Sequence, residues 1–411
     1  MELLLRNKNF LLLFLGTLLS TLGGSIFFIS VVWTAASELG GATAVSVVLS
    51  FQALPIIITA PFVGLFVDKR KKKNILVSSS LIDGFVLLFF AVLLKMNILN
   101  IWILSITIFV QQFVGSFMGS SFQTLIPLIV KDEDLSKANS LFSSANMLAQ
   151  LVGLGIGGIL VAFLGLQGAV IFNGLLFIIS AICEIFINYK EEIGKIVTEI
   201  KTFTGIKEGF AYAWKKIEIK GLILLEGASD FFGLALFVLL PVITQEVLKI
   251  GAEGYGILQA MSSVGSLVCG IMMSFITEVK RKYLWMAIFG VILGITFSMI
   301  GVISSFWILA VLLFIQGLLI GYDNIIISVI LQRETDRYYR GRVFSFRSMF
   351  NSILRPIGYM FVSLLLLFLS INQLIITYGI IIAILSLFYL LIPYASKRAK
   401  VEEQGSTTHR L

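Results

Sequence analysis

The sequence predicts an all-α membrane protein with twelve transmembrane helices in two six-helix bundles. Three observations support this prediction. First, 58% of the 411 residues are hydrophobic and only 13% are charged, and the mean hydropathy is +1.00. Soluble domains carry about 25% charged residues, so a bilayer has to serve as the solvent. Second, long apolar runs recur along the whole chain. Third, the two halves carry matching motifs.

The apolar runs define the expected helices in order. A helix that crosses a bilayer core needs about 20 apolar residues. The first half contains six expected spans, at 10–36, 44–67, 74–94, 101–130, 138–163 and 169–187. The second half contains six more, at 221–247, 255–277, 283–303, 306–331, 343–369 and 374–394. No small-residue cleavage site follows the first run, so we expect a retained helix and not a signal peptide.

The cations lie on one side of these spans. Every Lys and Arg except Lys95, Lys249, Arg347 and Arg355 falls in the loops or termini of that side, most densely at 69–73. By the positive-inside rule these loops and both termini are cytoplasmic. We therefore expect a multi-pass protein of the cell (plasma) membrane, in contact with its lipids. Because this pattern also explains the net charge of +8, it does not indicate a nucleic-acid partner.

A long polar stretch, residues 188–220, divides the chain. The expected organisation is an N-terminal bundle (1–187), a cytoplasmic linker (188–220), a C-terminal bundle (221–396) and a cytoplasmic tail (397–411). Apolar residues recur in the linker at helix-like spacing among Lys and Glu: Val197, Ile200, Phe203, Phe210, Trp214 and Ile217. This pattern predicts an amphipathic helix on the membrane surface, with a solvated linker as the alternative for the first half of the stretch.

The two halves repeat each other. Gly115-x-x-x-Gly119 corresponds to Gly317-x-x-x-Gly321, and the same offset aligns Asp132 and Asp134 with Glu334 and Asp336. The basic loop that follows Asp68 is matched by Glu278 and the three cations 280–282. Two six-helix repeats are typical of secondary transporters.

The loop Gly64–Lys73 consists of a glycine, three residues, Asp68 and five consecutive cations. It resembles the loop after helix 2 of the major facilitator superfamily. The resemblance implies that Asp68 helps to hold the cytoplasmic side closed, with Arg70 in the same gate and Glu278 as its counterpart in the second half. The chain departs from the family pattern at Lys69, where Arg is usual, and at Lys71, where Gly is usual.

Further motifs extend the resemblance over the whole chain. The string Gly153-Leu154-Gly155-Ile156-Gly157-Gly158 resembles the Gly-Pro-x-x-Gly-Gly signature of antiporters in this superfamily, with Leu154 in place of Pro; plain helix packing is the alternative. Other matching positions are Ser20–Gly23, Pro127, Ala138–Ser140, Glu208–Phe210, Pro241, Tyr255-Gly256, Gly341–Val343 and Pro356–Gly358. Together they resemble the macrolide-efflux-like drug:proton antiporter branch. Gln111 and Gln112 stand where such antiporters usually carry Arg, and Gly24 where they often carry an acid.

Carboxylates within the expected spans are the candidates for proton coupling. Ionisable groups in a bilayer are costly and usually face a cavity or a partner. Glu226 and Asp230 lie four residues apart on one helix face, and two carboxylates this close do not both ionise easily. We favour Asp230 as the proton site, followed by Glu226, Asp323 and Asp83. A helix-packing acid paired with a cation is the alternative for the Glu226/Asp230 pair.

Two arginines lie in the eleventh expected span. Arg355 precedes Pro356 near its middle, and we expect Asp323 to pair with Arg347 or, by a longer reach, with Arg355. Arg347 and Glu184 lie near the cytoplasmic edge, where we expect both to reach lipid headgroups. The candidate substrate-binding residues combine charge, aromatic rings and amides: Arg355, Asp230, Asp323, Tyr322, Gln52, Gln111, Gln112, Trp33 and Phe28.

These observations predict a secondary transporter that exports an amphiphilic drug-like or lipid-like molecule by proton antiport with alternating access. The alternatives are a proton-independent uniporter or lipid flippase, or a non-transporting sensor subunit. The lone His409 and the lack of nucleotide-binding, metal-ligand or nucleophile motifs argue against an enzyme, a cofactor or a metal. We expect the chain to act as a monomer on a small-molecule substrate.

Overall fold

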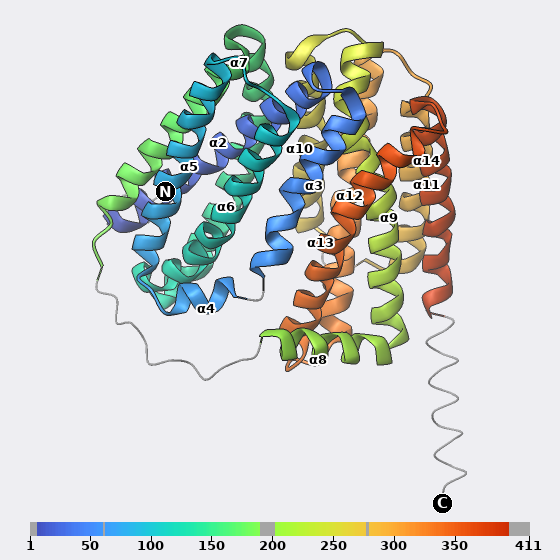
Figure 1. The fold of residues 1–411 in the computed structure, drawn as a ribbon. Coiled ribbons are helices and arrows are strands. Elements are labelled where there is room, and N and C mark those ends of the chain that lie inside the picture. The colour runs from blue at the N-terminus through green and yellow to red at the C-terminus, as the bar shows by residue number, and fades with distance from the viewer. Residues whose placement is uncertain (1–5, 61, 190–201, 277–278, 394–411) are drawn as a thin grey trace, which may run out of the picture. The chain divides into compact units, whose positions relative to one another are not determined.

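The computed structural model describes residues 6–60, 62–189, 202–276 and 279–393 (Figure 1), and no strand occurs within these ranges. Among the described helices, ten are long and apolar enough to cross a membrane. One of them, α7 (Leu135–Ile185), bends into two passes at Gly165. A further long helix, α13 (Arg340–Leu365), has the length to cross a membrane but a more polar composition than these ten. The predicted all-α fold with twelve spans is therefore confirmed.

The chain packs as two compact units. The first contains α2 to α7 together with Leu240–Ala260, and the second contains α8, α9 up to Leu239 and the chain from Met261 onward. The predicted linker 188–220 contains the helix α8 and the first residues of α9, which begins at Ile217, while residues 190–201 lie outside the described ranges.

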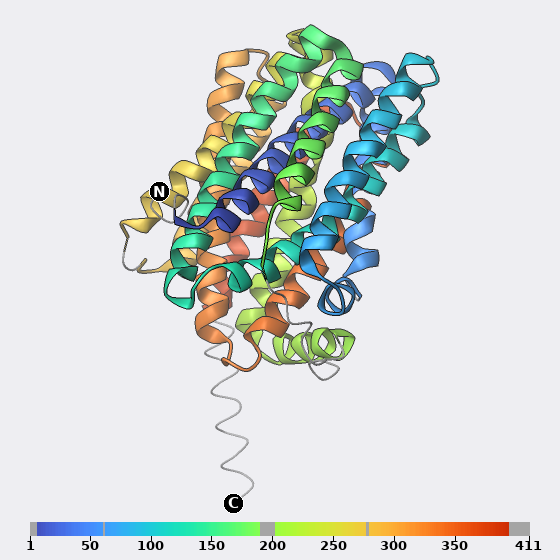
Figure 2. The ribbon, with the colours of Figure 1, turned by 90° about the vertical axis from the view of Figure 1, so that its left-hand side faces the viewer.

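Five long or broken helices build the first unit: α2 (Lys8–Glu38), α3 (Gly41–Thr59) with the short α4 (Val63–Asp68), α5 (Lys72–Lys95), α6 (Ile101–Ile129) and α7. Both α2 and α5 pack along α7 (Figure 2), and α3 packs along α6. Asn7 and Asn100 cap the first turns of α2 and α6 by accepting backbone hydrogen bonds. A buried aromatic cluster closes one end, with Phe142 packed edge-on against Phe10 and Phe122.

The connection inside α7 depends on a glycine. Gly165 has φ of 67° and ψ of 178°, a conformation that side chains with a Cβ rarely adopt. Two apolar segments can therefore follow each other with almost no polar loop between them. The predicted loop between spans five and six is thus reduced to a single bend.

Seven helices belong wholly or partly to the second unit: α8 (Thr202–Lys215), α9 (Ile217–Val242), α10 (Gly251–Ser274), α11 (Lys282–Ile300), α12 (Phe306–Glu334), α13 and α14 (Ile371–Leu387). A π-helical turn, Ile243–Val247, follows Pro241 at the end of α9. Helix α14 begins with a capping box between Ser370 and Gln373. Helix α8 lies across the ends of α9 and α13 (Figure 1) and packs on α13.

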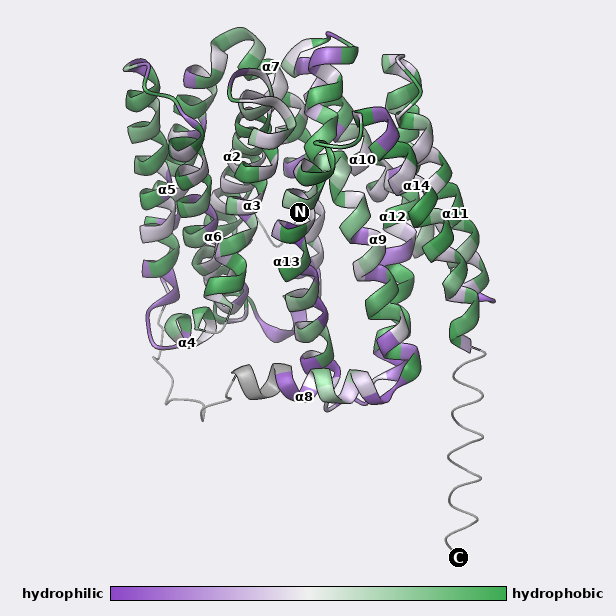
Figure 3. Cartoon of the chain, turned by 45° about the vertical axis from the view of Figure 1, so that its right-hand side comes forward, coloured by the Kyte–Doolittle hydropathy of each residue, from purple (hydrophilic) through white to green (hydrophobic). Residues whose placement is uncertain are grey.

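Large apolar side chains face outward over the helices. Phe163, Phe275 and Trp307 are each more than three-quarters exposed. Hydrophobic residues make up most of the long helices, and hydrophilic ones are frequent in α8 and in the loop after α4 (Figure 3). Together with ten described helices long and apolar enough to cross a membrane, exposed apolar area of this extent indicates a surface that faces lipid. The chain is therefore a multi-pass membrane protein.

Candidate functional site

Three carboxylates and two arginines come together in the second unit, from α9, α12 and α13. Glu226 on α9 and Arg347 on α13 form a two-pronged ion pair: Arg347 Nε donates to Glu226 Oε2 at 2.7 Å, and Arg347 Nη2 donates to Glu226 Oε1. Only 6% of the Glu226 side chain and 13% of the Arg347 side chain are exposed. A planar guanidinium matches a carboxylate in this geometry, so the pair joins α9 firmly to α13.

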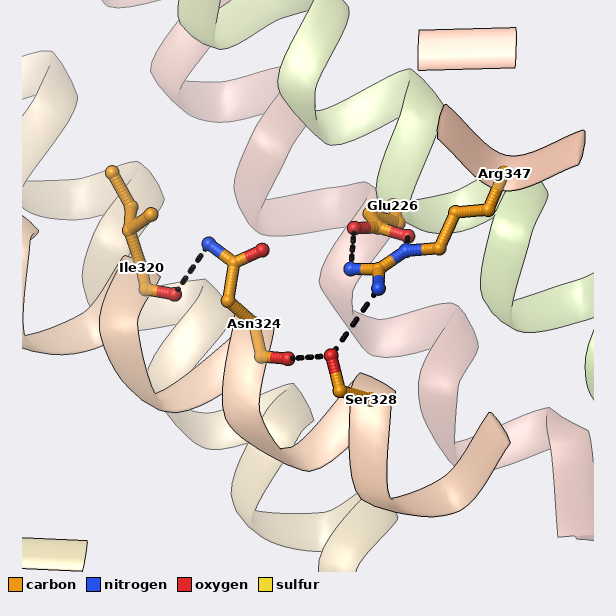
Figure 4. A network of polar contacts seen from close by, with 5 residues as sticks. All are labelled: Glu226, Ile320, Asn324, Ser328 and Arg347. Atoms are coloured by element: carbon orange, nitrogen blue, oxygen red, sulfur yellow. Dashed lines mark hydrogen bonds and ion pairs between the residues drawn. The ribbon is translucent and has the colours of Figure 1, made fainter. Parts of the chain in front are cut away.

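Helix α12 joins the same network (Figure 4). Arg347 Nη1 donates to Ser328 Oγ at 3.2 Å, and Ser328 Oγ donates to the Asn324 carbonyl at 2.7 Å. The Asn324 side chain in turn donates to the Ile320 carbonyl at 3.1 Å. Ser328 thus accepts one hydrogen bond and donates another, and Arg347 holds three helices together.

The other two carboxylates of the cluster lack such a partner. Asp230, one turn after Glu226 on α9, is exposed and lies within electrostatic range of Glu226, Arg355 and Arg347. Asp323 on α12 lies within range of Asp230 and Glu226. Its Oδ1 atom is buried and has no hydrogen-bond partner among the described residues. Within the described part of the chain, two of the three carboxylates therefore form no ion pair.

These contacts correct three expectations. The predicted Asp323–Arg347 pair is wrong, because Arg347 is taken up by Glu226 and Ser328. For Glu226 the alternative holds, since it is a helix-packing acid paired with a cation. Arg347 does not reach the headgroups, because its guanidinium is held in this pair. Arg355 is exposed and forms no ion pair within the described part of the chain.

Tyr322 lies beside Asp323 on α12 and is buried. Its ring packs edge-on against Phe289 with centroids 4.7 Å apart, and its hydroxyl has no hydrogen-bond partner among the described residues. A buried hydroxyl without a partner costs free energy, so Tyr322 stays a candidate for substrate binding.

In the first unit the predicted site residues are spread over several helices. Asp83 on α5 is 2% exposed, and its Oδ1 has no hydrogen-bond partner in the described ranges. Gln111 on α6 is buried, and its Nε2 is likewise without one. Gln112, Gln52 and Phe28 are half-buried.

Trp33 on α2 stacks on Tyr255 of α10, with ring centroids 6.2 Å apart. In the sequence Tyr255 is part of a family motif, and nothing in that motif predicts its stacking on Trp33. Periodicity does not reveal such a contact, because the two residues are more than two hundred positions apart.

Glu184 also differs from its expected position. Only 1% of it is exposed, and its carboxyl lies among the hydroxyls of Ser80 and Ser180 inside the first unit. It therefore does not reach the lipid headgroups. The position of α5 against α7, which the sequence does not specify, buries this side chain.

The glycine string on α7 forms two close helix–helix contacts, one with α2 and one with α10. Cβ atoms on Gly153 and Gly157 would meet the α2 backbone, at 2.8 Å from the Leu22 carbonyl oxygen and 3.0 Å from Ile26 Cα. A Cβ on Gly158 would press on the Ala252 peptide of α10, 3.0 Å from its carbonyl carbon. Gly155, in contrast, faces open space. Packing therefore accounts for three of the four glycines in the antiporter-like string.

At the predicted gate, Asp68 is exposed at the end of α4. The Arg70 guanidinium lies 4.5 Å from the centre of the Phe66 ring, and Lys72 Nζ donates to the Asp68 carbonyl at 3.4 Å. Glu278 lies outside the described residues. Asp68 is thus accessible for a latch contact, and the contacts of Arg70 and Lys72 stabilise the loop around it.

Helix α8 is tied to the second unit by contacts that sequence patterns missed. Glu208 pairs with Arg342 of α13, and the Tyr212 hydroxyl donates to Asp336 Oδ2 at 2.8 Å. Lys216 Nζ donates to the Glu334 carbonyl at 2.9 Å. Partial burial lowers the pKa of Lys216, but Tyr212 and the Asp336 and Glu334 carboxylates outweigh it, so the pKa lies above its ordinary value.

Comparisons with known proteins agree with this architecture. A sequence model described as the Major Facilitator Superfamily matches residues 13–294 and 222–410. Macrolide efflux protein A of Streptococcus pyogenes is 21% identical over 85% of this chain and 87% of its own length. The multidrug efflux pump Tap of Mycolicibacterium fortuitum is 22% identical over 81% of this chain and 83% of its own. The crystal structure of the nucleoside transporter NupG superposes with a TM-score of 0.74 at 12% identity, covering 94% of this chain and all of that one.

Proposed function

The chain belongs to the major facilitator superfamily and is a membrane transporter, not an enzyme; we propose that it exports an amphiphilic, drug-like or lipid-like molecule in exchange for protons. Its relatives include efflux proteins, and a macrolide is therefore the first substrate to test. Alternating access of the binding site to the two sides of the membrane would carry the substrate across.

The main support for this proposal is the cluster of Glu226, Asp230 and Asp323. Glu226 is neutralised by Arg347, whereas Asp230 is exposed and Asp323 keeps a buried oxygen without a partner in the described chain. Asp323 and Asp230 lie within electrostatic range of each other, so binding one proton relieves the repulsion between them. Asp230, which is exposed and close to Arg355, is our choice for proton exchange, and Asp323 is the second. Glu226 serves the site by positioning Arg347, and Asp83 is the candidate in the first unit.

Substrate recognition would combine Arg355 and the two free acids with aromatic and amide groups. The exposed Arg355 offers an anion-binding head, and the unpartnered Tyr322 hydroxyl offers a hydrogen bond in the second unit. In the first unit Trp33 and Phe28 supply stacking surface, and Gln52, Gln111 and Gln112 supply polar contacts. Such a mixture suits a molecule with a large apolar body and a few polar groups.

The test is transport by the full-length chain in proteoliposomes. An imposed pH gradient should drive macrolide movement, and Asp230→Asn should abolish that dependence on the gradient. Asp132→Asn, which changes an exposed carboxylate in the loop after α6, is the matched control and should behave as the unmodified chain. Proton antiport is wrong if the gradient drives no movement, or if Asp230→Asn remains fully coupled.

A proton-independent uniporter or lipid flippase is the second candidate. It is favoured by Gln111 and Gln112, which occupy α6 where drug antiporters usually have an arginine. In this case Asp230→Asn would leave downhill movement of macrolide or of a labelled lipid unchanged. The same proteoliposomes, run with and without the gradient, distinguish the two functions.

A further inference from the structure

A buried polar cluster in the first unit lies outside the proposed transport site. Glu184 on α7 is 1% exposed, and the serines around it, Ser20 of α2, Ser80 of α5 and Ser180 of α7, are at most 3% exposed. The groups that act on the Glu184 carboxyl are the hydroxyls of Ser80 and Ser180, with no charged partner. An ionised carboxylate buried in this way would carry a large desolvation cost.

The distances between oxygen atoms show how many donated hydrogens the cluster requires for its hydrogen bonds. Ser180 Oγ lies 2.8 Å from the Gly16 carbonyl, 3.2 Å from Glu184 Oε1 and 2.8 Å from Ser20 Oγ. Ser80 Oγ lies 2.9 Å from Glu184 Oε2. These are four oxygen–oxygen contacts, yet the three serines supply only three hydrogens.

The shortage falls on Ser180. Its single hydrogen can go to the Gly16 carbonyl or to Glu184, but not fully to both, and Ser20 uses its own hydrogen to reach Ser180. A hydrogen on Glu184 Oε1 completes the set. The acid then donates to Ser180, Ser180 donates to Gly16, and Ser80 donates to Glu184 Oε2.

We propose that Glu184 is a proton-binding site: a neutral carboxylic acid that donates to Ser180 and fastens α7 to α2 and α5. Gly16 permits this approach, because a Cβ there would lie 3.2 Å from Glu184 Cγ. Loss of the proton would leave a buried carboxylate facing a hydroxyl that has no hydrogen to spare. Release of this proton is therefore linked to separation of α2 from α7. The proposal is independent of the transported substrate.

The other titratable groups on the surrounding helices do not supply the missing hydrogen. On α5, Asp83 lies almost one turn beyond Ser80, and on α7 Cys183 adjoins Glu184. Helix α2 has titratable residues only at its ends, Lys8 and Glu38, and α6 has none. No described cation from these helices pairs with Glu184.

Infrared spectroscopy of the full-length chain in lipid nanodiscs tests the proposal. The carbonyl stretch of a protonated carboxylic acid is separate from the bands of a carboxylate. We expect Glu184→Gln to remove a protonated-acid band at neutral pH. Glu253→Gln changes an exposed acid at the start of α10 and should remove only carboxylate intensity. If Glu184→Gln removes carboxylate intensity and leaves the protonated-acid region unchanged, Glu184 is ionised and the proposal is wrong.

Ser180→Ala provides a second readout that does not change the acid. Because the Glu184 hydroxyl would lose its acceptor, the protonated-acid band should shift to higher frequency. Glu184→Gln should also keep the melting temperature, since its amide donates to Ser180 and accepts from Ser80, whereas Glu184→Ala should lower it. An unshifted spectrum in Ser180→Ala, or equal destabilisation by Gln and Ala, contradicts a neutral acid.

Discussion

At the scale of residues, the charged groups of the second unit divide into an ion pair, Glu226 with Arg347, and two carboxylates that we propose for proton exchange, Asp230 and Asp323. Glu226 and Arg347 satisfy each other inside the protein, whereas Asp230 and Asp323 have no ion pair among the described residues. Sequence spacing treats Glu226 and Asp230 as equivalents on one helix face. The partner on α13 distinguishes them, because the guanidinium reaches the acid one turn earlier on α9.

Arg347→Gln should destabilise the chain, because it leaves the Glu226 carboxylate buried without a cation. Breaking a buried pair costs about 3–5 kcal/mol, and the residual exposure of Arg347 places the expected loss near the lower end. The free energy of unfolding, measured by SDS titration in bicelles, should fall accordingly.

The double variant Glu226→Gln/Arg347→Gln serves as the control for this prediction. With both charges removed, no isolated ion remains, so a large part of the lost stability should return. If the loss of stability in the double variant equals the sum of the losses in Glu226→Gln and Arg347→Gln, the pair contributes no coupling energy.

At the scale of elements, the glycines of α7 form two groups, according to the helix that packs opposite each. Gly153 and Gly157 share one face, toward α2, while Gly158 faces the Ala252 peptide of α10. Small residues allow such close approach of helix backbones. The motif in the sequence therefore describes a packing surface, and its partner on α10 emerges only from the structure.

Gly158→Ala should destabilise the chain by about 1–3 kcal/mol, because the new methyl group presses on backbone that cannot rotate away. Gly155→Ala is a matched control in the same helix. Its methyl group meets nothing within 4 Å, and alanine favours a helix by up to about 1 kcal/mol over glycine. The melting temperatures of the two variants are compared in detergent. An equal decrease at both positions would contradict the close contact between Gly158 and α10.

The short helix α4 carries the second element-scale prediction. If the exposed Asp68 carboxylate is a gate latch and not a ligand, as the family resemblance implies, Asp68→Asn should slow export severalfold in proteoliposomes while leaving macrolide binding nearly unchanged. Asp132→Asn, which changes another exposed acid, should alter neither quantity. A large loss of binding in Asp68→Asn would exclude the latch role.

At the scale of the whole molecule, the charge pattern and the architecture agree. The family resemblance inferred from the motifs is confirmed by the match to the superfamily model, with macrolide efflux proteins among the relatives. The placement of the basic loops in the cytoplasm remains a prediction from the positive-inside rule.

Cysteine labelling in intact cells tests that placement. In a chain with Cys183 and Cys269 replaced by Ser, Lys71→Cys should resist a membrane-impermeant maleimide, whereas Met96→Cys, at the opposite end of α5, should react. Both positions are exposed, so access to reagent and not burial decides the result. Labelling of Lys71→Cys from outside would reverse the assigned topology.

The sequence by itself determined the twelve spans, the predicted orientation and the family, because these depend on local hydropathy, loop charge and short motifs. Tertiary structure decided which ionisable groups are satisfied. It paired Arg347 with Glu226 rather than Asp323, buried Glu184 among serines of α2, α5 and α7, and set Trp33 against Tyr255. Such contacts join residues a hundred or more positions apart, and local patterns contain no information on the rotation of one helix against another. The physical state of each buried charge depends on that rotation.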